Sequence, residues 1–389
     1  MKILLVGEFS GLHNHLKKGL NALGHEVTLV NNGDAFKDFP ADVSIKSSFF
    51  KSKLGNIPRQ LWYRIFNFDL ALLEHGIRFW WHLSKFKNYD VVQLINEAPI
   101  QTTNTLEYLL LKKLFKQNNK VFLLSCGVDS YQVNYMLSKK PKYSVMTPYL
   151  ENPKVHTKTY AYYFDFINPR FNKITDIIYS NCSGIIATDF DYIDALKDNK
   201  KYVGYIPYPL SNSLSNPLSN SLSNSNKKVA ILLGINTGNA IKKGISYFQE
   251  ALQIIEEQYP NQVEVLIAQD LPYTVYQTYF KKADIVLDQV YSFDQGYNAL
   301  EGMLHGKVVF TGAETQFLEY YHLQEDEICI NALPNVSYLV EKLSFLIENT
   351  SKIDEIGQNA KAFVVKFHDA KNVAQHYETI YLKQKLYIP

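Results

Sequence analysis

The regular alternation of short aliphatic runs with longer amphipathic stretches is the feature that most constrains how this chain folds. Runs that are apolar throughout predict strands buried on both faces, as in a parallel sheet covered by helices. Between the first two runs, residues 12–24 have helical spacing and end at Gly24, a residue typical of helix C-termini. This order indicates a doubly wound α/β domain. The predicted strands of the first half are Ile3–Val6, Glu26–Val30, Asp90–Leu94, Lys120–Leu124 and Gly184–Ala187.

A polar tandem repeat interrupts the alternation after Ile206. The sequence PLSNSLSN occupies residues 209–216 and again residues 217–224. A polar, low-complexity segment with Pro in each copy cannot form a core of its own and is typical of a linker. After it the alternation starts again, with predicted strands at Val229–Leu233, Val263–Ile267, Asp284–Leu287 and Lys307–Phe310.

Two α/β domains are therefore expected, because a single domain usually has roughly 100–200 residues and this chain has 389. Open α/β sheets bind ligands beyond the carboxyl ends of their strands, so functional residues are expected in those loops. The expected organisation is a Rossmann-like domain over 1–206, a linker over 207–227, a second Rossmann-like domain over 228–370, and a C-terminal helix over 371–389 that packs back on the first domain.

The composition argues against several classes of protein. A net charge of +2 gives no basic surface of the kind that nucleic acids require. Cys126, Cys182 and Cys329 are odd in number and far apart, which argues against a disulfide framework or a zinc site and favours a reducing cytoplasm. The N-terminal apolar run is broken at Glu8, too early for a signal peptide, and no long apolar run predicts a membrane-spanning helix. We expect a cytoplasmic protein, or one attached peripherally to the inner face of the membrane.

Residues 283–312 (ADIVLDQVYSFDQGYNALEGMLHGKVVFTG) carry the clearest chemical pattern. A strand runs into a loop, and Gly296 then opens a helix that carries Glu301. The N–H groups and positive dipole end of a helix N-terminus suit a diphosphate, and Gly296 lets the backbone approach a ligand without a Cβ in the way. A carboxylate one turn inside can accept hydrogen bonds from two vicinal hydroxyls, such as those of a ribose. The alternative for Glu301 is an exposed helix residue without a ligand.

This segment resembles the C-terminal half of GT-B glycosyltransferases, specifically the retaining class often called family 4. Residues 296–303 and 306–309 are similar to the family's G…LEAM…GKPV signature. In that family two glutamates lie eight positions apart. Glu301 corresponds to the second, which binds the donor ribose, whereas Phe293 occupies the position of the first, which lies near the sugar. Asp294 is the neighbouring carboxylate and the candidate for the sugar-side role.

The resemblance implies two Rossmann-like domains that face each other across a cleft. The C-terminal domain would hold a nucleotide-sugar, which is a co-substrate rather than a cofactor, and the N-terminal domain would border the acceptor. It also implies a metal-independent reaction that retains anomeric configuration. Electrostatic stabilisation of the departing nucleoside diphosphate would then dominate catalysis.

The loop at residues 232–244 (LLGINTGNAIKKG) extends the resemblance. In the family this loop has an arginine and then a Lys-Gly pair, and both cations grip the donor diphosphate. Lys243 matches the second cation, Thr237 takes the place of the arginine, and Lys242 can add a point charge without the guanidinium fork. The resemblance implies donor contacts for these residues and for Asn236. Without it, Lys-Lys-Gly is more often a solvated helix start.

Further donor contacts are expected on two other segments. By resemblance the nucleobase lies where the strand before Leu271 ends, although an ordinary strand-to-helix turn explains that residue equally well. The helix start at Gly296, Tyr297 and Asn298 is expected beside the diphosphate and the sugar.

Polar residues after the strands of the N-terminal half are the acceptor-side candidates. The loop after the first strand lacks a GxGxxG pattern, and by resemblance Ser10, Gly11 and His13 border the acceptor and the donor phosphates. A satisfied histidine is the alternative for His13. Glu97 and Asp129 each end a predicted strand and could position or deprotonate an acceptor hydroxyl, or simply cap a helix.

Three tryptophans, all those in the chain, lie in a stretch interleaved with arginines. A basic and aromatic helix face can lie on an anionic membrane, which would suit a lipid-linked acceptor. The alternative is a helical hairpin packed on the N-terminal sheet. The residues concerned are Arg59, Trp62, Arg64, Arg78, Trp80 and Trp81.

Together these patterns predict a glycosyltransferase that moves a hexose-type sugar from a UDP-sugar, or less favoured a GDP-sugar, to a glycan or lipid-linked acceptor in bacterial-type cell-surface polysaccharide assembly. The alternatives are a non-catalytic GT-B protein that binds a nucleotide or glycan, which the Phe293 substitution favours, and a nucleotide-sugar epimerase.

Overall fold

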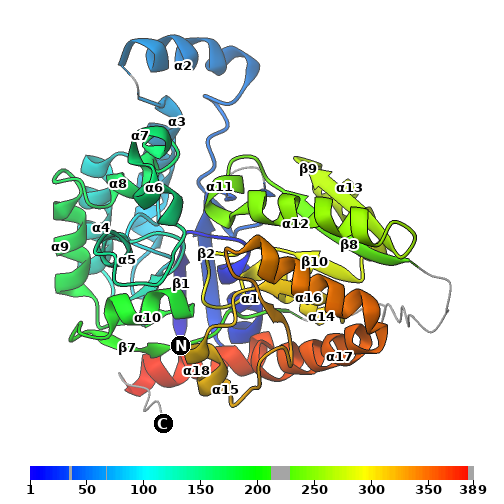
Figure 1. Ribbon diagram of the computed structural model, residues 1–389. Helices are drawn as coiled ribbons and strands as arrows, with labels where there is room; N and C mark the ends of the chain where they lie inside the picture. Colours follow the sequence, from blue (N-terminus) through cyan, green and yellow to red (C-terminus); the bar gives the residue numbers. More distant parts are fainter. Residues whose placement is uncertain (35–36, 67, 212–227, 384–389) are drawn as a thin grey trace. The chain divides into compact units, whose positions relative to one another are not determined.

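The computed structural model describes residues 1–34, 37–66, 68–211 and 228–383, so most of the expected linker lies outside the described residues. The chain divides into two compact units, each built on a parallel sheet (Figure 1). The N-terminal unit comprises Met1–Tyr135, Ala161–Ser211 and the chain from Asp369 onward. The C-terminal unit comprises Met136–Tyr160 and Asn212–His368.

The N-terminal unit contains a seven-stranded parallel sheet in the order β3-β2-β1-β4-β5-β6-β7. The order reverses between β1 and β4, so the loops that follow these two strands border one crevice. The strands are β1 (Lys2–Val6), β2 (Glu26–Asn31), β3 (Val43–Ser44), β4 (Val91–Leu94), β5 (Lys120–Ser125), β6 (Gly184–Ala187) and β7 (Tyr202–Tyr205). The two edge strands, β3 and β7, were not predicted because neither is an aliphatic run.

Helices cover this sheet, and the last helix of the chain belongs to this unit. Helix α18 packs along α1, and its buried side chains recur every three to four residues at Val373, Tyr377 and Ile380. The helices are α1 (Leu12–Ala22), α2 (Lys53–Phe66), α3 (Leu70–His82), α4 (Asn104–Lys116), α5 (Ser130–Leu137), α8 (Ala161–Asp165), α9 (Asn172–Asn181), α10 (Phe190–Leu196) and α18 (Ala370–Lys383).

The C-terminal unit contains a five-stranded parallel sheet in the order β12-β11-β10-β8-β9. The strands are β8 (Val229–Ile235), β9 (Val263–Gln269), β10 (Ile285–Leu287), β11 (Val308–Thr311) and β12 (Ile330–Asn331). The helices are α6 (Thr147–Glu151), α7 (Pro153–His156), α11 (Ala240–Lys243), α12 (Ile245–Gln258), α13 (Tyr273–Lys282), α14 (Tyr297–Leu304), α15 (Thr315–Tyr321), α16 (Val336–Glu348) and α17 (Thr350–Phe367).

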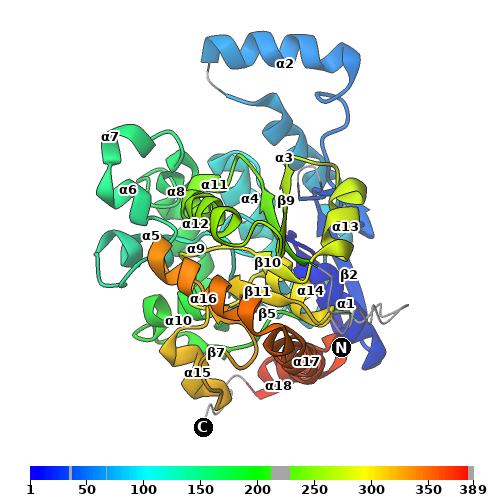
Figure 2. The same cartoon turned by 45° about the vertical axis from the view of Figure 1, so that its right-hand side comes forward.

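Alternation along the C-terminal strands divides the core between two helical layers. Ile231, Leu233 and Phe310 point into a cluster with the apolar faces of α12 and α16, which lie side by side in Figure 2. On the other face, α14 comes so close to the sheet that a Cβ on Gly302 would lie 2.8 Å from Cγ2 of Val309.

The α/β fold predicted from the sequence is confirmed, and the predicted strands match the observed ones to within one or two residues. The segment Met136–Tyr160 had been expected in the first domain but contacts the C-terminal unit. The ring of Tyr143 meets that of Phe293 edge-on at 5.6 Å, and its hydroxyl donates to Glu314. No helix in the described part of the chain has both the length and the hydropathy to cross a bilayer.

Candidate functional site

In the C-terminal unit, the strand order places two loops next to each other. Strand β8 pairs with β9 on one side and with β10 on the other, so the order reverses between β8 and β10. The loops after these strands therefore meet at the position where open α/β sheets bind ligands. The first loop leads to Lys243, and the second leads to the start of α14.

A buried carboxylate that was not predicted as a site residue holds Lys243 at this junction. The Nζ atom of Lys243 lies 2.7 Å from Oδ1 of Asp288, the residue that follows β10. The Asp288 side chain is 2% exposed, whereas that of Lys243 is 30% exposed. Asp288 also accepts a 2.9 Å hydrogen bond from Nδ2 of Asn298 on α14. One carboxylate thus fixes a cation and the first turn of a helix relative to each other.

Gly244 makes this arrangement possible. Its φ of +66° lies in the left-handed region, and a Cβ there would stand 2.3 Å from Cγ2 of Val290. The backbone N–H of Val290 donates to the carbonyl of Lys243 at 3.0 Å. The Lys-Gly pair noted in the sequence is therefore a turn that packs directly on the loop after β10.

Glu301 lies on α14 and faces α13. Its Oε1 atom accepts hydrogen bonds from the hydroxyl of Tyr273 at 3.0 Å and from Nε2 of Gln277 at 3.1 Å. Burial and the neighbouring Glu301 carboxylate raise the pKa of Tyr273 to about 12, so this phenol stays a hydrogen-bond donor. Glu301 is therefore an oriented acceptor rather than an unrestrained surface side chain.

The loop after β8 is tied to the loop after β9. The backbone N–H of Thr237 donates to Oδ1 of Asp270 at 3.0 Å, and its hydroxyl donates to the other carboxylate oxygen. Asn236 turns the loop by accepting from the N–H of Gly238 at 3.0 Å. Thr237, which takes the place of the family's arginine, is thus a loop-closing residue in this structure.

The other predicted donor residues lie around the same strand ends. Leu271 is 37% exposed immediately after Asp270, and burial lowers the pKa of Lys242. Gly296 caps α14 from an extended conformation, and a Cβ there would meet nothing closer than Nε2 of Gln289 at 4.0 Å. Tyr297 is the first residue of the helix.

Phe293 and Asp294 precede this helix. The backbone carbonyl of Phe293 accepts from the N–H of Glu314 at 3.0 Å. Asp294 is 3% exposed, and a Cβ on Gly312 would lie 2.6 Å from its backbone nitrogen. The sugar-side candidate is thus buried where two loops touch.

In the N-terminal unit, the first loop is held by its own side chains. Ser10 has a φ of +54° and donates its N–H to Asp34 at 2.8 Å, and Gly11 has a φ of +89°. His13 is fully buried, with Nδ1 at 2.7 Å from the carbonyl of Gly7 and Nε2 at 3.1 Å from Nε2 of Gln93. Burial lowers the pKa of His13 to about 3, so the ring is neutral at neutral pH.

Glu97 and Asp129 come together at the start of α5. Glu97 accepts from the N–H and hydroxyl of Ser130 at 2.9 and 2.7 Å, and Asp129 accepts from the N–H of Gln132 at 2.7 Å. Burial raises the pKa of both carboxyls, and the neighbouring Asp129 raises that of Glu97 further. Asp129 caps α5 locally, whereas Glu97 reaches the start of the same helix from a distant position in the sequence.

The whole chain resembles solved structures of one fold. It matches the sucrose-phosphate synthase of Thermosynechococcus elongatus with a TM-score of 0.61 at 14% identity, covering 99% of each chain. HepE of Anabaena, solved in complex with UDP and glucose, matches with a TM-score of 0.55 at 14% identity over 97% of this chain and 98% of that one. The UDP-GlcNAc 2-epimerase of Neisseria meningitidis bound to UDP-GlcNAc gives 0.50 at 12% identity over 98% and 100%.

The fold is therefore GT-B, with two Rossmann-like domains. Residues 239–379 match the family described as glycosyl transferase-like. The matched range includes the Lys243 turn and the whole of α14. No curated protein matches the chain in sequence. The resemblance read from residues 296–309 is confirmed at the level of GT-B glycosyltransferases.

Sequence reasoning missed Asp288, Tyr273 and Gln277. Asp288 could have been predicted as a site residue, because a charged residue directly after an aliphatic strand of a parallel sheet lies at the ligand-binding edge. Tyr273 and Gln277 carried none, since only the packing of α13 against the sheet brings them to Glu301.

Proposed function

We propose that this chain is a glycosyltransferase that moves a hexose-type sugar from a nucleoside diphosphate sugar to a glycan or lipid-linked acceptor. Its pathway would be bacterial-type cell-surface polysaccharide assembly. The observation that carries the proposal is that Asp288 binds both Lys243 and Asn298 of the first turn of α14, in a segment that matches a glycosyl transferase-like family. A UDP-sugar is favoured over a GDP-sugar because HepE, which shares the fold, was solved with UDP and glucose.

In this proposal the donor diphosphate lies at the N-terminus of α14, beside the Lys243 ammonium. The helix N–H groups and this cation stabilise the charge that develops on the departing nucleoside diphosphate, without a metal ion and with retention of configuration. The ribose hydroxyls donate to Glu301. Asp294 is the candidate for contact with the sugar, so Asp294→Asn should lower turnover while leaving UDP affinity unchanged.

Glu97 and Asp129 take a positioning role in this proposal. Both are almost completely buried and accept hydrogen bonds from the start of α5, so they hold the loop after β5 in place. Ser10 and Gly11 would then border the acceptor through their backbone. His13 supports that loop from beneath.

Nucleotide binding tests the donor site. Thermal shifts with UDP, GDP, ADP and CMP, with and without magnesium, should reveal stabilisation by one nucleoside diphosphate without metal. Glu301→Ala should then weaken UDP binding about 10- to 150-fold, the equivalent of about 1.5–3 kcal/mol for hydrogen bonds to a charged group. The same variant should bind 2′,3′-dideoxy-UDP as tightly as the unaltered protein does. If Glu301→Ala and the unaltered protein bind UDP with equal affinity, the ribose does not bind at Glu301.

Two other functions have an observation in their favour. Phe293 at the position of a family glutamate favours a non-catalytic binding protein, and the fold is shared with a UDP-GlcNAc 2-epimerase. Incubation with a UDP-sugar separates the three functions. Acceptor-dependent release of UDP indicates a transferase, an epimerised sugar without acceptor indicates an epimerase, and tight binding without turnover indicates a binding protein.

A further inference from the structure

Helix α2 has an apolar face that is open to solvent. Only Gly55 is buried among its 14 residues. Its large apolar side chains recur at spacings of three and four, so they share one side of the helix. Their exposed fractions run from 42% for Trp62 to 84% for Leu54. The members of this apolar arc are Leu54, Ile57, Leu61, Trp62, Ile65 and Phe66.

The stability of α2 has to come from something other than its own sequence. Figures 1 and 2 both show α2 standing clear of the sheet of the N-terminal unit, with α3 as the helix that it contacts. Pro58 lies inside the helix and has no N–H to donate, and Gly55 is a poor helix former. Isolated helices of this length are marginal in water, and most gain their stability by burying an apolar face. We therefore expect the apolar arc of α2 to be buried against an apolar environment.

The opposite face of α2 is polar and basic. Between Ile45 and Phe68 the sequence has five cations and no Asp or Glu. A hollow of about 530 Å³ on this side is lined by Asn56, Arg59, Gln60, Tyr63, Arg64 and Asp69. Arg59 is paired with Asp69 in this hollow, so the positive charge that this face offers to an anionic surface comes from Lys53 and Arg64.

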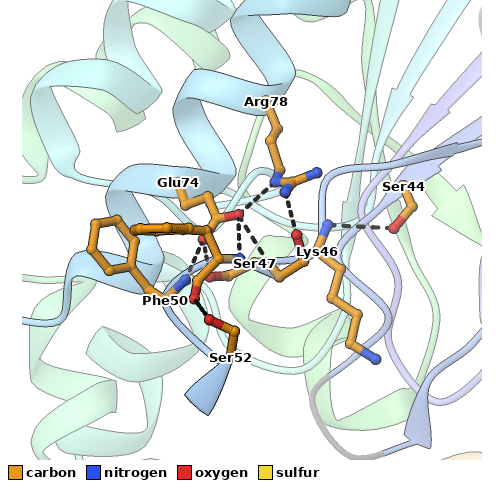
Figure 3. Close-up of polar contacts among 9 residues, drawn as sticks. Ser44, Lys46, Ser47, Phe50, Ser52, Glu74 and Arg78 are labelled. Carbon is orange, nitrogen blue, oxygen red and sulfur yellow. Dashed lines mark hydrogen bonds and ion pairs between the residues drawn. The ribbon is translucent and has the colours of Figure 1, made fainter. Parts of the chain in front are cut away.

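A buried carboxylate anchors the chain that leads into α2. Glu74 on α3 accepts the backbone N–H groups of residues 48–50, at 3.0 Å each, and the hydroxyl of Ser47, while Arg78 braces it at 2.8 Å (Figure 3). Burial raises the pKa of Glu74, but the Ser47 hydroxyl and these N–H groups outweigh it and hold the pKa at about 2. The carboxylate is therefore ionised, and it clamps the loop.

A second contact holds α2 to the start of α3. The Nε and Nη2 atoms of Arg59 lie 2.6 and 2.7 Å from the two carboxylate oxygens of Asp69. Asp69 also caps α3 by accepting from the N–H of Ala71. With both contacts made, α2 is tethered to α3 while its apolar arc stays uncovered.

We propose that α2 is an interfacial helix that lies in the surface of an anionic lipid bilayer. The apolar arc would enter the boundary of the acyl chains, and Lys53 and Arg64 would meet the negatively charged headgroups. Trp62 is of the residue type that favours this depth. Arg78, Trp80 and Trp81, which the sequence places in the same stretch, lie on α3, where Glu74 engages Arg78. The proposed surface is the apolar arc of α2 together with Lys53 and Arg64. The proposal does not depend on the donor site.

Vesicle binding by the full chain tests the proposal. Cosedimentation with phosphatidylglycerol–phosphatidylcholine vesicles should fall at least about tenfold for Leu61→Ser/Ile65→Ser. Arg64→Gln and added salt should reduce it severalfold, because salt screens exposed charges. Phe345→Ser, which removes a 48% exposed side chain from α16 in the C-terminal unit, is the matched control and should bind like the unaltered chain. Circular dichroism should show all variants folded, since the altered side chains are exposed.

Fluorescence reports the depth of α2 directly. Trp80→Phe/Trp81→Phe leaves Trp62 as the single tryptophan, and its emission should shift to the blue with anionic vesicles and be quenched by brominated acyl chains. Absence of vesicle binding, or binding that survives Leu61→Ser/Ile65→Ser, would overturn the proposal. So would a vesicle-free dimer that the same double variant dissociates, because a second copy of the chain would then cover the arc.

Discussion

At the contact between α1 and α18, replacing Gly19 by Ala should destabilise the chain, although Ala has the higher intrinsic helix propensity. Gly19 lies inside α1, where Ala is favoured over Gly by about 1 kcal/mol. A Cβ at this position would lie 2.0 Å from the carbonyl oxygen of Ala370 and 2.9 Å from Cβ of Ala374. The nearest atom belongs to the backbone and cannot rotate away, so Gly19→Ala forces α1 and α18 apart.

The expected size follows from these two opposing effects. Overpacking a tight contact typically costs about 1–3 kcal/mol, and the backbone clash places this case at the upper end. After subtraction of the propensity gain, Gly19→Ala should lower the free energy of unfolding by about 2 kcal/mol. For a unit of this size each kcal/mol shifts the melting temperature by about 2–4 °C, so a fall of about 4–8 °C is expected.

Thermal unfolding followed by circular dichroism measures this shift. Asn21→Ala is the matched control, because Asn21 is an exposed residue of the same helix. A melting temperature for Gly19→Ala that equals or exceeds that of Asn21→Ala would refute the reasoning. It would mean that the C-terminal helix does not pack on the N-terminal unit at Gly19, and the placement of α18 (Ala370–Lys383) would have to change.

Two further predictions each concern one buried carboxylate, Glu74 in the N-terminal unit and Asp288 in the C-terminal unit. The pKa of Glu74 in the folded chain, about 2, lies below its ordinary value of 4.5, so its stabilising contribution is complete above about pH 4.5 and is lost as the pH falls toward 2. The melting temperature of Glu74→Gln should thus fall below that of the unaltered chain at neutral pH and converge with it in acid, whereas the exposed Glu341→Gln should show no such convergence. Lys243→Met should lower the unfolding free energy by about 3 kcal/mol, the lower end for a broken buried pair, because it leaves Asp288 buried without its cation while Lys243 itself is 30% exposed. Adding Asp288→Asn should recover part of that loss in chemical unfolding, and strictly additive losses would contradict the pair.

Local sequence determined the α/β class and pointed to the two segments proposed to bind the donor. The aliphatic runs predicted most strands because a strand buried on both faces must be apolar at successive positions, wherever it lies in the sheet. The Lys243-Gly244 turn and the Gly296–Glu301 helix start were visible because each combines a special backbone need with chemistry inside a few residues. Segments without such a pattern, such as β7, were missed.

Tertiary structure alone decided how these pieces are held. Lys243 and Asp288 are 45 positions apart, and Tyr381 reaches the buried Gln93 across 288 positions. Likewise, Glu97 and Asp129 looked like acids at strand ends but share one buried helix start. The sequence states which side chains are available near a strand end, whereas burial and pairing depend on segments that the chain brings together from far away. Burial and pairing set the protonation state and the position of each side chain. The arrangement of the candidate site therefore depends on the tertiary structure.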